Sequence, residues 1–158
     1  MIDKIAVASR CSFTRARALL KQHTLKLDWE TFVSDIARSI FEPPHTPAKL
    51  SSVRLALSTL LLNYLHAPVV LRVMMDELLA LACAEISRPD SLMREIIAAA
   101  ACFDARLQSG GTHQLIHLVG FSARVMVNVA AAHSIEAKYK HALARKEQKE
   151  YVVRKQNP

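Results

Sequence analysis

A chain of 158 residues of which 51% are apolar can bury one continuous core, and this excludes a wholly disordered protein. Only 3 Gly and 6 Pro interrupt a sequence rich in Ala, Leu, Lys and Arg, so helices rather than strands are expected. The three cysteines are odd in number and form no Cys-x-x-Cys pair, which argues against a disulfide framework and a structural zinc site; no cofactor is predicted.

The net charge of +7 is concentrated at the two ends of the chain. Residues 1–26 carry six Lys or Arg against one acid, and residues 136–158 carry seven against three. Residues 27–135 carry eight against ten, so the middle is close to neutral. This distribution predicts a basic N-terminal segment (1–27), a helical core (28–133) and a basic polar C-terminal helix or tail (134–158). Basic ends indicate an acidic partner, or simply two solvated termini.

The N-terminal segment contains no acid between Lys4 and Leu27. Its apolar and basic residues would lie on different faces of a helix, so the segment is expected to be helical. The same composition is typical of a mitochondrial transit segment. We therefore predict an intracellular protein, with the mitochondrion as one possible compartment. The candidate contacts of this segment to a protein partner or to phosphate are Arg10, Arg15, Arg17 and Lys21.

Helix breakers divide the core into units of equal length. Starting from Pro47, the breakers Pro68, Pro89 and Gly110 each follow the previous one by 21 residues. Proline is tolerated in the first turn of a helix, so each proline is expected to start or precede one. The predicted helices cover residues 28–41, 47–66, 68–87, 92–108 and 114–132.

From Ser134 to about Arg154 the chain alternates Lys, Arg, Glu and Gln, a pattern that predicts a polar helix. Its continuity with the preceding helix is left open. A polar helix of this kind is marginal alone in water, so an ordered one indicates that it contacts a partner. The candidate contact residues are Lys138, Lys140, Arg145, Lys146, Lys149 and Arg154.

Helices of similar length with short connections are expected to pack antiparallel against their neighbours in the chain. The sequence therefore predicts an all-α fold, an antiparallel bundle of about six helices. Two of the repeated units together approach the length of a HEAT or armadillo repeat, so a short helical stack is the alternative architecture.

The sequence carries no catalytic motif, since a phosphate-binding glycine loop, Gly-x-Ser-x-Gly and His-Glu-x-x-His are all missing. We predict no catalytic residues. One polar stripe on helix 114–132 includes a histidine pair at i and i+4, which could bind a metal ion if another helix supplied a third ligand. The favoured interpretation is the solvent edge of a core helix, with a glycine that lets another helix approach, and no metal site. The stripe consists of His113, His117, Gly120, Arg124 and Asn128, and the possible third ligands are Glu95, Cys102 and Asp104.

Charged residues at helical spacing predict exposed ion pairs, Arg72 with Asp76 and Glu85 with Arg88. Exposed pairs of this kind contribute only about 0.3–0.5 kcal/mol each. They indicate a solvated face rather than a catalytic site.

A membrane-spanning helix is not expected. The longest uncharged run, residues 55–71, is short for a bilayer and contains Pro68. The apolar run 115–132 includes Arg124. Both runs are interpreted as buried helices of a bundle.

These observations favour a non-catalytic helical subunit or adaptor of a larger macromolecular assembly. Its core would pack against other protein subunits, and its basic N- and C-terminal segments would dock on acidic surfaces. The alternative is an RNA- or DNA-binding protein that contacts phosphates through the same basic segments.

Overall fold

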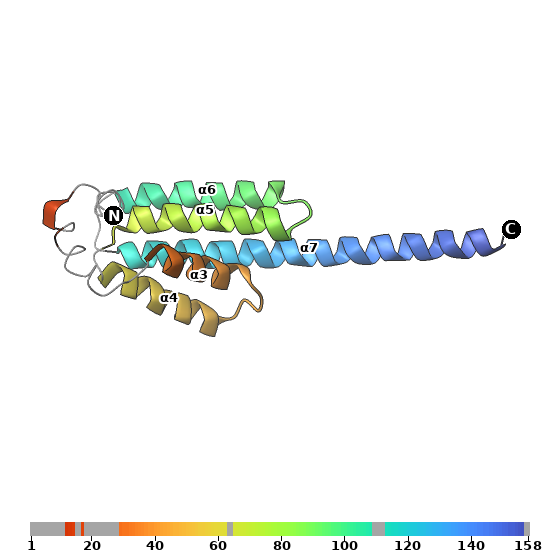
Figure 1. Ribbon diagram of the computed structural model, residues 1–158, viewed down its shortest axis with the longest axis horizontal. Helices are drawn as coiled ribbons and strands as arrows, with labels where there is room; N and C mark the ends of the chain where they lie inside the picture. The colour runs from red at the N-terminus through yellow and green to blue at the C-terminus, as the bar shows by residue number, and fades with distance from the viewer. Residues whose placement is uncertain (1–11, 15–16, 18–28, 63–64, 109–112, 157–158) are drawn as a thin grey trace.

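The computed structural model describes residues 12–14, 17, 29–62, 65–108 and 113–156, and within the last helix it describes side chains as far as His141 and at Arg145. This part of the chain contains five long helices and no strand (Figure 1). The predicted all-α class is therefore confirmed. The helices are α3 (Trp29–Phe41), α4 (Pro47–Leu62), α5 (Ala67–Glu85), α6 (Asp90–Gln108) and α7 (Gln114–Gln156).

The predicted breakers mark where these helices begin. Pro47 opens α4, and the Thr46 hydroxyl oxygen accepts a hydrogen bond of 3.2 Å from the backbone N–H of Lys49, as expected of a helix cap. In α5 a proline occupies the first turn, and the capping residue His66 has an extended backbone. The turn between α3 and α4 contains a cis peptide bond between Pro43 and Pro44.

The tail does not form a separate helix. The segments predicted as 114–132 and 134–154 form one helix, α7, of 43 residues. The alanine run before His133 favours helix, and nothing between Ala132 and Ile135 breaks it, so the chain continues in the same direction. Figure 1 shows the C-terminal half of α7 extending beyond the other helices. We call residues 134–156 the α7 extension.

The chain direction alternates from α3 to α7 in an up-and-down order (Figure 1). Neighbours in space follow a closed ring, α3, α5, α6, α7, α4 and back to α3, and α7 contacts all four other helices. The prediction that every helix packs against its neighbour in the chain is wrong for α4 and α5, because α3 occupies the position beside α5. A stack would join each helix only to its chain neighbours. Here α3 packs on α5 and α4 packs on α7, so the described helices form a closed bundle.

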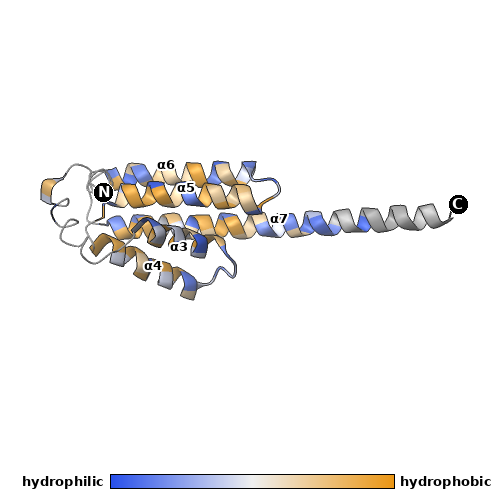
Figure 2. Cartoon of the chain, in the orientation of Figure 1, coloured by the Kyte–Doolittle hydropathy of each residue, from blue (hydrophilic) through white to orange (hydrophobic). Residues whose placement is uncertain are grey.

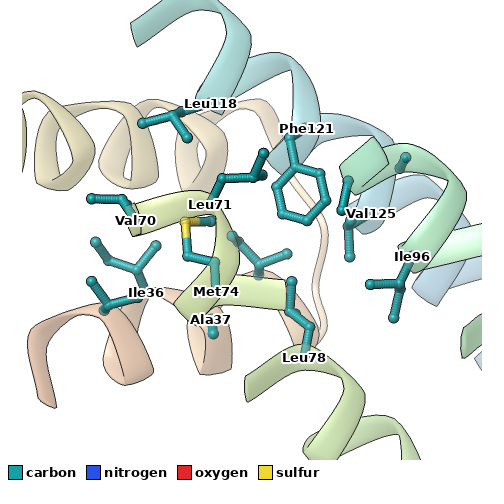
Figure 3. Packing of buried hydrophobic residues seen from close by; sticks show 14 of the residues in the cluster. Ile36, Ala37, Val70, Leu71, Met74, Leu78, Ile96, Leu118, Phe121 and Val125 are labelled. Carbon is teal, nitrogen blue, oxygen red and sulfur yellow. The ribbon is translucent and has the colours of Figure 1, made fainter. Parts of the chain in front are cut away.

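The core lies inside this ring and uses side chains from all five helices. Figure 3 shows part of it, with labelled side chains from α3, α5, α6 and α7. The largest fully buried side chains of the core include Phe41 and Phe121. Phe121 meets the ring of Phe103 edge to face, with centroids 6.4 Å apart. Gly120 makes this approach possible, because a Cβ atom there would lie 2.8 Å from a ring carbon of Phe103. The predicted role of Gly120 in close helix packing is therefore confirmed.

Candidate interaction surface

The α5–α6 turn and α7 form a groove at the point where α7 leaves the bundle. The groove encloses about 340 Å³, and its walls are mostly apolar with charged groups at the rim. Inside it, the side-chain nitrogen of Asn128 is buried and has no hydrogen-bond partner among the described residues. We call this the exit groove; it is lined by Ile86, Ser87, Arg88, Ser91, Leu92, Glu95, Asn128, Ala131, Ala132, Ile135, Glu136 and Tyr139.

Polar contacts across the exit groove hold the start of the α7 extension against the bundle. The Ser87 hydroxyl donates a hydrogen bond of 2.7 Å to Glu136. The Arg88 guanidinium lies 4.9 Å from the centre of the Tyr139 ring and donates to the Tyr139 hydroxyl at 3.4 Å. These contacts join residues 49 and 51 positions apart in the chain. They tie the start of the α7 extension to the α5–α6 turn.

Glu136 is the acid in this contact. Its carboxylate accepts the hydrogen bond from Ser87 and forms an ion pair of 3.2 Å with Lys140, and both interactions lower the pKa of Glu136, with Ser87 the larger cause. The negative charge of Glu136 is therefore already compensated by Lys140 within the chain. The exposed pair predicted for Glu85 and Arg88 is replaced in this structure by the contact of Arg88 with Tyr139.

A second groove, of about 890 Å³, lies between α3, α5 and α6. It has apolar walls and carries both acidic and basic side chains. It is lined by Trp29, Glu30, His66, Pro68, Val69, Leu71, Arg72, Val73, Met75, Asp76, Ile97, Ala100, Ala101, Asp104 and Gln108. The Asp104 carboxylate accepts a hydrogen bond of 2.5 Å from the side chain of Gln108 in this groove.

Two histidines, His45 of the α3–α4 turn and His133 of α7, lie near each other. The His133 ring meets Phe41 edge to face, with centroids 5.7 Å apart. Both ring nitrogens of His45 and one of His133 are buried without a hydrogen-bond partner among the described residues. Burial, the Lys49 ammonium and His133 together hold the pKa of His45 below its ordinary value of 6.5. The fold therefore favours the neutral form of His45.

This preference predicts that the bundle loses stability as the pH falls below about 6.5. Above that pH His45 is neutral in both the folded and the unfolded chain and contributes nothing. Below it the unfolded chain takes up a proton that the folded chain resists, so acid favours unfolding. Urea unfolding of the wild type and of His45→Gln, at about pH 7.5 and about pH 5.5, should show a smaller pH dependence in the variant. Identical pH dependence in the two proteins would contradict this assignment.

The basic residues predicted as contacts divide into two groups. Arg10, Arg15 and Lys21 lie outside the described residues, while Arg17 is described and exposed. The remaining six all belong to helix α7. The side chains of Lys138, Lys140 and Arg145 are exposed; those of Lys146, Lys149 and Arg154 lie outside the described part.

The histidine pair of the predicted stripe lies partly on the surface: His113, just before α7, is exposed, and His117 in α7 is half-buried. Among the residues that the structure describes, no three His, Cys, Asp or Glu side chains are grouped so that they could hold a metal ion. The candidate third ligands of the sequence therefore do not join this histidine pair into such a group.

In the described part of the chain, one segment is long and apolar enough to cross a membrane, Gln114–His141 of α7, with a mean hydropathy of 1.6. A core helix passes the same test. α7 contacts every other described helix and buries Phe121 and Val125 among them, so its apolar side chains have a place inside the bundle.

A family model, replication factor C subunit 3, C-terminal domain, matches residues 29–133 of this chain. The chain belongs to this family. The match begins at the first residue of α3 and ends where α7 leaves the bundle, so we call residues 29–133 the replication factor C domain. The α7 extension lies outside it.

A curated relative of this chain is replication factor C subunit 5 of Neurospora crassa, 32% identical over 99 residues. The aligned residues make up 63% of this chain and 26% of the relative, so the chain spans about a quarter of the length of that relative. Neither comparison supports the mitochondrial or the RNA-binding interpretation of the basic segments.

Sequence reasoning missed the exit groove. Ser87, Arg88 and Glu136 are ordinary surface residues by any local pattern, and only the packing of α6 on α7 brings them together. The one available signal was Ile135 and Tyr139, large apolar residues four apart in an otherwise polar tail, which predict a contact on one helix face.

Proposed function

We propose that this chain is a non-catalytic helical domain of a replication factor C subunit, which packs against other protein subunits of an assembly. The observation that carries the proposal is the family match over residues 29–133, which covers the whole bundle. Both comparisons name a subunit, and a subunit needs partner chains. An intracellular location follows from the same proposal.

The surface of α4 supports a protein partner. Leu55 and Leu62 are 70% and 77% exposed and lie seven residues apart, so they share one face of the helix. The hydroxyls of Ser52 and Thr59 donate to backbone carbonyls of α4 itself, at 3.2 and 3.1 Å. These hydroxyls are therefore already satisfied, and the face behaves as a weakly polar surface that another protein can cover. We call Ser52, Leu55, Thr59 and Leu62 the α4 face.

Among the described helices, α4 packs closely on α3 and α7, and Leu55 and Leu62 on its α4 face are exposed. Protein interfaces place apolar side chains at their centre and polar groups at the rim. Two exposed leucines on one helix face provide such a centre, whereas the α7 extension provides charge. The bundle is thus suited to binding protein through α4, which is a different surface from the α7 extension.

Co-expression with the other replication factor C subunits of the same organism tests the proposal. Affinity capture of the full chain should retain those subunits. Leu55→Glu with Leu62→Glu should weaken their retention at least about tenfold, because an interface would have to bury two unpaired charges. Circular dichroism should show an unchanged fold, since both side chains are exposed.

The matched control is Ala80→Glu with Ala84→Glu, which adds the same charge to two exposed positions of α5. This variant should retain the partner subunits. Failure of the wild-type chain to capture any of these subunits would refute the proposed function. Equal losses in the two variants would refute the role of the α4 face alone.

A further inference from the structure

One face of the α7 extension carries basic residues and no acid. Lys138, His141, Arg145 and Lys149 follow one another at spacings of three, four and four residues, which places them on the same side of a continuous helix. The side chains of Lys138, His141 and Arg145 are exposed. We call these four positions the basic face.

The acids of the extension lie on the other side of the helix. At about 100° per residue, Glu136, Glu147 and Glu150 fall roughly opposite the basic face. Glu136 is in addition engaged by Ser87 and Lys140. The helix therefore does not neutralise its own basic face.

The extension also projects away from the bundle. In Figure 1 no other labelled helix runs beside the blue end of α7, and in Figure 2 its coloured residues beyond the bundle are mainly hydrophilic. Among the described side chains, Glu136 and Tyr139 join the extension to the bundle through Ser87 and Arg88. The basic face is thus presented on a helix that continues directly from the bundle.

The chemistry of the basic face fits nucleic acid better than protein. The centre of a protein interface is depleted in Lys and needs apolar or aromatic anchors. The basic face offers cations and polar groups instead, with Ser134 and Gln148 beside them by register. Contact with a phosphate backbone needs only such groups, and a helix rise of about 1.5 Å per residue spreads Lys138 to Lys149 over about 16 Å of that backbone.

We propose that the basic face of the α7 extension binds the phosphate backbone of a duplex nucleic acid. The extension lies outside the residues matched by the replication factor C family, so nothing in that match assigns this site. The proposal is independent of the role of the α4 face, since it concerns a different helix and a different kind of partner.

Fluorescence anisotropy of the full chain with a short labelled DNA duplex, and with an RNA duplex of the same sequence, tests the proposal. Three Lys or Arg contacts give a slope of about −2.7 in log affinity against log salt, so binding should weaken about 40-fold between 50 and 200 mM salt. Binding of either duplex with this salt response supports the phosphate site. Binding that does not change with salt, or no binding to either duplex, would overturn it.

Two double variants separate the basic face from the overall charge. Lys138→Gln with Arg145→Gln removes two cations of the basic face, and the salt slope should become shallower by about 1.8 with a loss of affinity of about tenfold or more. Lys140→Gln with Arg154→Gln removes two cations that lie on the opposite side by register, and affinity should stay within about twofold. Circular dichroism checks that both variants keep their helix.

Equal losses in the two variants would show a response to net charge alone and would refute the assignment to one face. Competition by poly-glutamate as effective as that by unlabelled duplex would refute a phosphate-specific partner. A chain that captures protein subunits but does not bind duplex would refute the phosphate site and leave the proposed function standing.

Discussion

Replacing Phe121 with alanine should lower the free energy of unfolding by about 3–5 kcal/mol, among the largest effects available in this chain. Phe121 is fully buried, and its ring faces that of Phe103 across the α6–α7 contact. Figure 3 shows it among Leu118, Val125 and side chains of α5. Because α7 contacts every other helix, the cavity would open at the centre of the bundle. Urea or guanidinium unfolding followed by circular dichroism measures the change.

The matched control for Phe121 is Val127→Ala on the same helix. Val127 is 67% exposed, so its truncation should change stability by no more than about 0.5 kcal/mol. Similar effects of the two substitutions would mean that α7 does not place Phe121 in the core.

The second large effect is expected for Leu57→Ala in α4, about 2–5 kcal/mol. Leu57 is fully buried, and α4 packs on α3 and α7. The substitution therefore tests whether the ring is closed, because it would weaken the packing of α4 on α7, a helix far from it in the chain. Thermal and denaturant unfolding of the variant, compared with the wild type, give the measurement.

Leu55→Ala provides the control two residues away on the same helix. Leu55 is 70% exposed and belongs to the α4 face, so its truncation should cost at most about 0.5 kcal/mol. A loss below about 1 kcal/mol for Leu57→Ala would contradict the packing of α4 in the closed bundle.

The two proposals assign different tasks to the two parts of α7. Within the replication factor C domain, α7 is the helix that all other described helices pack against, and the proposed protein-binding surface is the α4 face. Beyond that domain, the same helix presents the basic face. A partner bound to one part would therefore be rigidly connected to a partner bound to the other, because no break separates the two halves of the helix.

The candidate contact residues were only partly predictable. The basic residues of the tail are visible as a charge excess, and their spacing on a helix places Lys138, Arg145 and Lys149 on one face. The groove at their base was not predictable, because Ser87 and Glu136 are 49 residues apart and no local pattern pairs them. Local rules paired Arg88 with Glu85 instead, since residues three apart on a helix are neighbours.

The fold shows the same division. Composition, the evenly spaced prolines and the cap at Thr46 were enough to predict the helical class and most helix starts, because capping and proline geometry act within a few residues. They could not decide that α3 rather than α4 lies beside α5, since that choice depends on which apolar faces fit together across the core. The sequence by itself thus determined the helices and the charge of the ends. Only tertiary packing decided the ring order, the exit groove and the direction in which α7 presents its basic face.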